Sequence, residues 1–378
     1  MARNGSVVFA LLALEVLDEL VFGAREAAWP LIRRDLHLSY AEVGLLLGIP
    51  AYASIVTEPV VGVLGDTRWR RALVGGGGVA FAASVAGAAV SQSFWPLLLS
   101  FVVLFPASGA FVSLSQATLM DLAPDARERN MARWSVAGGV GAVAGPLAIA
   151  ATAGSAGGWR WVFAGFALLG VVLLVAAMRA WPATTAGAPT RPSFRAALGA
   201  ARRPTVVRWL VVLECADLMT DVVLGFLALY FVDEVGASPE TGGLAVAVWT
   251  AVGLVGGLGI VVLLRRVSGL AYLWASAPAA AILFAALLLV PGIAAKLVLV
   301  ALLGLATSGW YSIPKARLYA ALPGQSGAAL ALGSLAGVIR GVTPLAIGLA
   351  AERYGLGTAM WLLLGAPVGL LLFLPRRS

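Results

Sequence analysis

The chain has 378 residues, of which 61% are hydrophobic and only 12% are charged, and its mean hydropathy is +0.95. This composition excludes an ordinary soluble domain and a disordered chain, and the long, continuous apolar stretches exclude a transmembrane β-barrel. The net charge of +8 does not indicate a nucleic-acid partner, because the basic residues follow a topological pattern that is described below.

Twelve apolar segments are long enough to span a bilayer, and a polar, proline-containing stretch separates them into two groups of six. The expected spans are residues 6–32, 41–65, 72–91, 94–120, 131–153 and 159–181, followed by 206–233, 240–264, 271–290, 294–320, 326–350 and 355–375. We therefore expect an all-α polytopic membrane protein with two six-helix bundles related by pseudo-two-fold symmetry. The expected boundaries are 1–181 for the N-terminal bundle, 182–205 for a cytoplasmic linker and 206–378 for the C-terminal bundle.

The first predicted helix carries three acids near its middle, Glu15, Asp18 and Glu19. On an insertion scale each acid costs roughly 2.5–3.5 kcal/mol at the bilayer centre, whereas a leucine or valine returns only about 0.3–0.6 kcal/mol. The three acids therefore offset most of the apolar gain of this segment. We interpret them as functional groups, because acids inside membrane spans mark substrate and proton pathways.

The same acidic pattern returns 199 residues later, where LEVLD ending at Asp18 becomes LECAD ending at Asp217. Glu15 then matches Glu214, each pair lies on one helix face, and Asp221 extends the second pair by one turn. Further residues match at the same offset: Ser39 with Ser238, Gly44 with Gly243, and Pro124 with Pro323. A period of half the chain indicates two copies of one bundle, an arrangement in which binding sites lie between the repeats near the midplane.

The loop after the second predicted helix reads GVLGDTRWRRAL over residues 62–73. This stretch resembles the loop signature of the major facilitator superfamily, in which a Gly, a Leu, an Asp and a basic pair stand at these spacings; Trp69 stands where that signature usually has Gly. The resemblance implies a conformational latch that holds the outward-open state, formed by Gly62, Asp66, Arg70 and Arg71. An acid at a helix exit can also meet the positive N-terminus of a neighbouring helix.

Two later stretches are similar to other signatures of the superfamily. DLAPDAR at residues 121–127 is similar to its second cytoplasmic loop, and GGVGAVAGP at residues 138–146 is similar to the Gly-rich fifth-helix signature of its antiporters. Glycines allow another helix to approach closely, and proline introduces a bend. We therefore expect helix packing at Gly138, Gly141, Gly145 and Pro146.

The beginning of the chain is also similar to fosmidomycin-resistance-type drug exporters. The likeness rests on Asp18, on WPL at residues 29–31 and on EPVVG at residues 58–62, and it implies efflux and drug resistance. The antiporter signature with a central arginine in the fourth helix is missing from LFPASGAF at residues 104–111. The resemblance therefore gives no support for a proton step that depends on that arginine.

The intramembrane acids and one cation form the predicted proton- and substrate-binding set: Glu15, Asp18, Glu19, Glu58, Glu214, Asp217, Asp221 and Arg340. Glu58 is expected to be a further buried acid, and Arg340 is the expected switchable partner of Asp217 or Asp221. Burial and mutual repulsion both favour the protonated form of neighbouring acids, as a proton carrier requires. We therefore predict a secondary transporter that exports a small amphipathic or cationic compound by proton antiport, with alternating access.

The same residues leave other interpretations open. A divalent-cation exporter would use the hard oxygen ligands of Glu15, Asp18, Glu214 and Asp217, and an uptake symporter for a small polar solute also fits, because a fold does not set direction. An enzyme is disfavoured, since the sequence has no GxSxG, HExxH, P-loop or CxxC motif. With one cysteine and one histidine, the chain cannot build a Cys or His metal centre, and no cofactor is expected.

The distribution of basic residues predicts the topology. With a cytoplasmic N-terminus, few fall on the predicted outer side: Arg33, Arg34, Arg160, Lys296 and Arg353. This asymmetry is the positive-inside pattern. We expect a multi-pass monomer of the inner (cytoplasmic) membrane with both termini in the cytoplasm. Its expected partners are a small-molecule substrate, protons and the lipid bilayer, but no nucleic acid.

Overall fold

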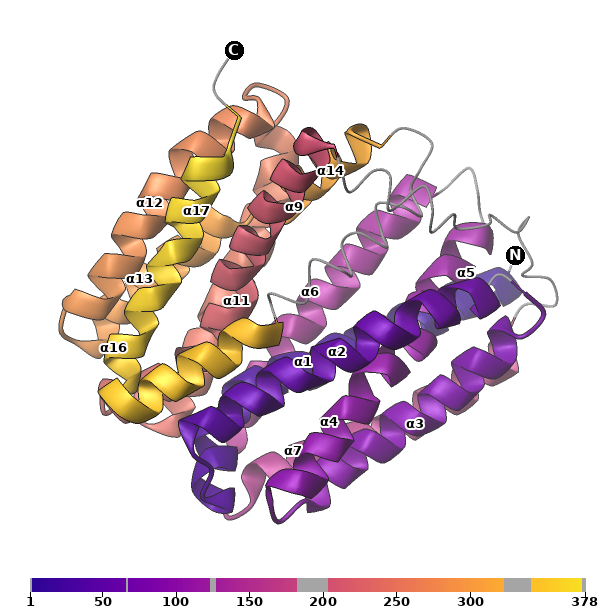
Figure 1. Ribbon diagram of the computed structural model, residues 1–378. Coiled ribbons are helices and arrows are strands. Elements are labelled where there is room, and N and C mark those ends of the chain that lie inside the picture. Colours follow the sequence, from indigo (N-terminus) through magenta and orange to yellow (C-terminus); the bar gives the residue numbers. More distant parts are fainter. Residues whose placement is uncertain (1, 66, 123–126, 182–202, 323–340, 376–378) are drawn as a thin grey trace. The chain divides into compact units, whose positions relative to one another are not determined.

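The computed structural model of the protein describes residues 2–65, 67–122, 127–181, 203–322 and 341–375 (Figure 1). Within these ranges the regular structure is entirely helical. Asp66, Arg340 and most of the predicted linker lie outside the described residues.

The helices of the first half follow the predicted order: α1 (Ala2–Leu36), α2 (Tyr40–Gly65), α3 (Arg70–Val90), α4 (Phe94–Ser108), the π-helical η1 (Gly109–Ser113), α5 (Leu114–Leu122), α6 (Arg127–Thr152) and α7 (Gly158–Ala180). The second half begins with α9 (Pro204–Asp217), the π-helical η3 (Leu218–Val222), α10 (Val223–Leu229) and the π-helical η4 (Tyr230–Glu234). It continues with α11 (Pro239–Leu263), α12 (Gly269–Leu289), α13 (Ile293–Thr307), α14 (Ser312–Ala320), a helical stretch at 341–354, α16 (Leu356–Met360), the 3-10 helix η5 (Trp361–Leu364) and α17 (Gly365–Phe373).

In the described ranges, nine helices are long and apolar enough to cross a membrane. The helix α1 and the helical run 204–234, which carry the acids of the two repeats, are not among these nine. Each predicted segment coincides with a helix at least in part, and the stretch 341–354 is the described part of the eleventh segment.

Matching serine caps begin the second helix of each half. The backbone N–H of Ser39 donates to the Glu42 carboxylate at 2.8 Å, and the backbone N–H of Glu42 donates to the Ser39 hydroxyl at 3.1 Å. This is a capping box, and it satisfies two backbone donors at the start of α2. At the start of α11, Ser238 accepts from the backbone N–H of Thr241 at 3.4 Å. The sequence match between the two serines therefore corresponds to a shared helix start.

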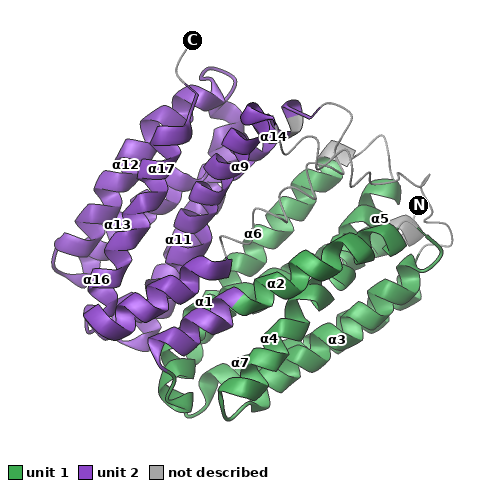
Figure 2. Cartoon of the chain, viewed as in Figure 1, with its two compact units in different colours: residues 1–38, 49–191 green, residues 39–48, 192–378 purple. Residues whose placement is uncertain are grey.

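The chain divides into two compact units (Figure 2). Unit 1 comprises residues 1–38 and 49–191, and unit 2 comprises residues 39–48 and 192–378. In unit 1, α1 packs on α6 and α7, and α3 packs on α4 and α7; in unit 2, α13 packs on α11 and α12, and α17 packs on α9. The sequence had assigned residues 39–48 to the first bundle, so this short segment is grouped differently.

Close backbone contacts explain why residues 39–48 group with unit 2. A Cβ atom on Gly44 would lie 2.5 Å from the carbonyl oxygen of Pro344, and one on Gly348 would overlap the carbonyl of Tyr40. The backbone N–H of Tyr40 also donates to the Glu352 carboxylate at 2.9 Å. The start of α2 is thus held by the helical stretch 341–354, through glycines that permit this approach.

Candidate functional site

The helices α1 and α6 are in close contact, and glycines of α6 allow their backbones to meet. A side chain on Gly141 would overlap the carbonyl oxygen of Val16, and one on Gly145 would overlap that of Leu20. The face of α6 toward α1 carries the residues that the sequence assigned to helix packing: Gly138, Gly141, Gly145 and Pro146. This contact places Glu15 and Glu19 of α1 directly beside α6.

Glu15 and Glu19 both face α6. The Glu15 carboxylate oxygen Oε1 would lie only 2.7 Å from a Cβ atom on Gly138, and the carboxyl group forms a side-chain hydrogen bond with Trp134. The Cβ atom of Glu19 would lie 2.8 Å from a Cβ atom on Gly141. Because Gly138 and Gly141 have no side chains, α6 leaves space for these two acids.

Asp18 lies between its neighbours in the sequence but faces a different helix. The Ser108 hydroxyl, at the end of α4, donates to Asp18 Oδ2 at 3.0 Å. The other oxygen, Oδ1, is buried and has no hydrogen-bond partner among the described residues. A buried acceptor without a partner costs about 1–3 kcal/mol, so this oxygen is an unfavourable feature of the described structure.

A buried arginine that the sequence interpretation overlooked lies two helical turns beyond Asp18. The Arg25 guanidinium is 7% exposed and lies over the rings of Phe22, Phe101 and Phe105, at 5.1, 5.9 and 5.0 Å from their centroids. Its Nε donates to Glu26 at 3.2 Å, and its Nη2 is ion-paired with the same carboxylate. The seven-residue spacing from Asp18 would have placed it on the same helix face.

In unit 2, the matching acids lie on α9 and η3. Glu214 and Asp217 are buried, at 5% and 3% exposure, and Asp221 lies in the π-helical segment that begins directly after Asp217. Asp217 and Asp221 line one pocket of about 490 Å³. The pocket is completed by polar, aromatic and glycine residues: Thr220, Trp249, Gly253, Gly304, Thr307, Ser308 and Tyr311.

The repeat extends to the hydroxyl group that accompanies each acid. Ser108 bonds to Asp18 in unit 1, and the residue 199 positions later is Thr307, which lines the pocket of Asp217 in unit 2. Each hydroxyl residue ends its helix, α4 or α13. The offset that relates the acids would therefore also have found their hydroxyl neighbours, which the sequence interpretation did not single out.

A family model of the major facilitator superfamily matches residues 20–339. The chain belongs to this superfamily. It is therefore a multi-pass membrane transporter with twelve helices rather than an enzyme, and the fold and family predicted from the sequence are confirmed.

Solved structures of two other transporters have the same fold. A bacterial homologue of the human lysosomal transporter Spinster, in an inward-facing and occupied conformation, is 16% identical with a TM-score of 0.80, over 99% of this chain and 95% of that one. The nucleoside transporter NupG is 14% identical with a TM-score of 0.76, over 97% of each chain. No curated protein gave a significant sequence match.

The predicted latch of this superfamily member is described in part. Arg70 is buried, and its guanidinium donates to Asp121 at 2.6 Å and to the Gly65 carbonyl. Arg71 is exposed and donates to the Met178 carbonyl at 3.3 Å. Gly62 is exposed, with open space beside it, and Asp66 lies outside the described residues. The latch therefore stays a prediction.

Glu58 and Arg340 are the remaining predicted site residues of the transporter. Glu58 is exposed, so the expectation that it is buried is wrong; its Cγ atom would lie 3.9 Å from a Cβ atom on Gly109, at the start of η1. Arg340 lies outside the described residues, so its pairing with Asp217 or Asp221 stays a prediction.

The four acids proposed as alternative metal ligands divide between the two units. Glu15 and Asp18 belong to unit 1, and Glu214 and Asp217 belong to unit 2. Among the residues that the structure describes, no group of three or more His, Cys, Asp or Glu side chains is arranged to hold a metal ion.

Proposed function

We propose that this transporter exports a small amphipathic or cationic compound in exchange for protons, by alternating access, with Asp18 and Asp217 as the central acids. The observation that carries the proposal is the buried Oδ1 of Asp18, which has no hydrogen-bond partner in the described part of the chain. A proton or a donor group of a bound cation would satisfy this oxygen. A permanent structural carboxylate would instead have had its oxygens paired.

The pocket in unit 2 supports a cationic or amphipathic substrate. Asp217 and Asp221 supply carboxyl groups to its lining, and Trp249 and Tyr311 are aromatic residues of the same lining. Organic cations bind well where carboxylates and aromatic faces lie together. The volume of about 490 Å³ is in the range of about 300–1,000 Å³ that is usual for sites of small organic molecules.

Transport in liposomes tests the proposal. The purified protein is reconstituted with ethidium, a lipophilic organic cation, and the pH dye pyranine reports proton movement after a pH gradient is imposed. We expect Asp18→Asn and Asp217→Asn to abolish proton-driven ethidium movement, because an amide cannot bind and release a proton. Glu240→Gln, at the start of α11, is the matched control, since it also replaces one acid by its amide and lies outside the site.

Exchange without a gradient separates coupling from substrate binding. If Asp18→Asn still exchanges ethidium across the membrane but no longer responds to the pH gradient, Asp18 is the proton site. Unchanged proton-driven transport in both variants would contradict the assignment. Protons moving in the same direction as ethidium would show symport instead of antiport.

A further inference from the structure

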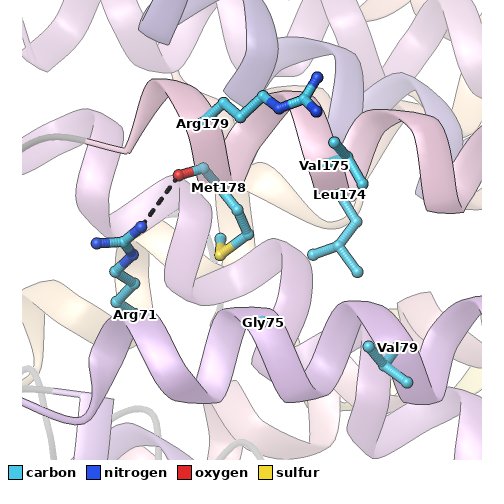
Figure 3. Close-up of a pocket in the computed structure, with 7 residues that line it drawn as sticks. All are labelled: Arg71, Gly75, Val79, Leu174, Val175, Met178 and Arg179. Atoms are coloured by element: carbon cyan, nitrogen blue, oxygen red, sulfur yellow. Dashed lines mark hydrogen bonds between the residues drawn. The ribbon is translucent and has the colours of Figure 1, made fainter.

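A groove of about 590 Å³ lies in unit 1 between α3 and α7 (Figure 3). Its walls come from both helices: Arg71, Gly75 and Val79 from α3, and Leu174, Val175, Met178 and Arg179 from α7. The groove contains none of the acids assigned to transport. Its volume lies in the range of about 300–1,000 Å³ in which proteins bind small molecules, so it is large enough for an occupant.

The two arginines of the groove lie at the same end of the helix pair. Arg71, at the start of α3, donates to the carbonyl of Met178 near the end of α7 at 3.3 Å. Arg160, near the start of α7, donates to the carbonyl of Ala89 near the end of α3 at 3.0 Å. The helices are therefore antiparallel, and Arg71 and Arg179 both stand at the ends of membrane spans, at the depth of lipid headgroups.

The guanidinium groups of this pair retain free donors. In the described part of the chain, neither Arg71 nor Arg179 forms an ion pair, and the contact with Met178 is the one hydrogen bond of Arg71. Both arginines are exposed. Arg70 differs, because it is buried and pairs with Asp121. The groove thus has two arginines in its lining that form no ion pair among the described residues; in Figure 3 the Arg179 guanidinium extends away from Arg71, toward Val175.

The rest of the groove is apolar and open. Val79 is 62% exposed and Val175 is 40% exposed, so both offer apolar surface along the groove. A Cβ atom on Gly75 would meet only the Met178 sulfur, at 3.6 Å, and the side chain of Met178 points toward this glycine in Figure 3. The glycine therefore leaves the groove free between its charged end and its apolar wall.

We propose that this groove binds one anionic phospholipid, with its phosphate at Arg71 and Arg179 and an acyl chain along Gly75, Val79 and Val175. Phosphate oxygens accept readily from guanidinium donors, and basic pockets between membrane helices recognise anionic headgroups. Charge and shape together carry this inference. A topological preference for arginine at a helix end would account for the charges, but not for a hollow beside them that continues into apolar surface.

Native mass spectrometry of the full-length protein tests the site. The purified transporter is titrated with dioleoylphosphatidylglycerol or dioleoylphosphatidylcholine, and the apparent Kd of the first retained lipid is measured. We expect tighter retention of phosphatidylglycerol. Arg179→Gln should weaken it about fivefold, since each basic residue near the surface contributes about that factor. Gly75→Leu should weaken retention of both lipids, because its side chain fills the groove without changing charge.

The matched control is Arg265→Gln/Arg266→Gln, which removes exposed charges from the loop between α11 and α12 and should leave the first Kd unchanged. Size-exclusion profiles establish that each variant is folded. An equal loss of affinity in this control, or equal retention of the two lipids by the wild type, would overturn the proposal. Displacement of the lipid by millimolar glycerol 3-phosphate would also overturn it, because it would show a free-anion site that does not use the apolar wall.

Discussion

Arg25 and Glu26 are neighbours in α1, and both charges are largely removed from solvent, with side-chain exposures of 8% and 15%. Two charges taken out of water are tolerated only when each compensates the other. Three phenylalanine rings surround the guanidinium, and the Trp29 indole donates to the second oxygen of Glu26 at 3.1 Å. Each buried charge is therefore tolerated because the other is present. Substitutions can remove the Arg25 charge alone or both charges together.

Replacing Arg25 alone should be more harmful than replacing both members of the pair. Arg25→Leu leaves the Glu26 charge buried, and we expect a loss of about 3–5 kcal/mol in the free energy of unfolding. Arg25→Leu/Glu26→Gln should recover most of this loss, because glutamine is neutral and still accepts from Trp29. Unfolding in mixed micelles gives the free energies, with the exposed Arg353→Leu as control. A double variant as unstable as the single one would contradict this account.

At the scale of single helices, the helical pattern was readable from the sequence, but the local departures from it were not. The spacing of Glu15 and Asp18 predicts one helix face, yet Asp18 bonds to Ser108 on α4, whereas Glu15 faces α6. Such differences depend on side chains from distant helices. The π-helical segments η1 and η3 begin directly after Ser108 and Asp217. The α-helical period of the sequence does not predict them.

The glycine row of α6 leads to a prediction about packing. Gly141→Leu should destabilise the protein by about 1–3 kcal/mol or more, the usual penalty of overpacking, because its side chain would overlap the backbone of α1 at Val16. Gly165→Leu on α7 is the matched control, since nothing lies within 4 Å of its added Cβ atom. The control should keep or slightly raise stability, because leucine is the better helix former. Thermal unfolding midpoints of the two variants in detergent decide the matter; equal midpoints would refute the packing role.

For the whole molecule, composition and the internal repeat were sufficient to predict the twelve-helix fold, and the resemblance of residues 62–73 to a loop signature indicated the superfamily. Hydropathy shows the length of each apolar segment, and the 199-residue offset indicates that the two halves are repeats of one structural unit. Neither hydropathy nor the repeat predicts which helices have backbones in contact. The grouping of residues 39–48 with unit 2 follows from glycine contacts at Gly44 and Gly348, and the groove at Arg71 and Arg179 follows from the pairing of α3 with α7. Both needed tertiary structure.

Orientation in the membrane is the prediction that belongs to the whole chain. The positive-inside pattern places the loop between α11 and α12 in the cytoplasm and the loop between α6 and α7 outside. Cys215 is the only cysteine, so a Cys215→Ala background allows single reporter cysteines at the exposed positions Ala156 and Arg266. We expect a membrane-impermeant maleimide to label Ala156→Cys in intact cells and to label Arg266→Cys only after permeabilisation. The reverse pattern would invert the topology and move both termini outside, because an even number of spans keeps them on one side.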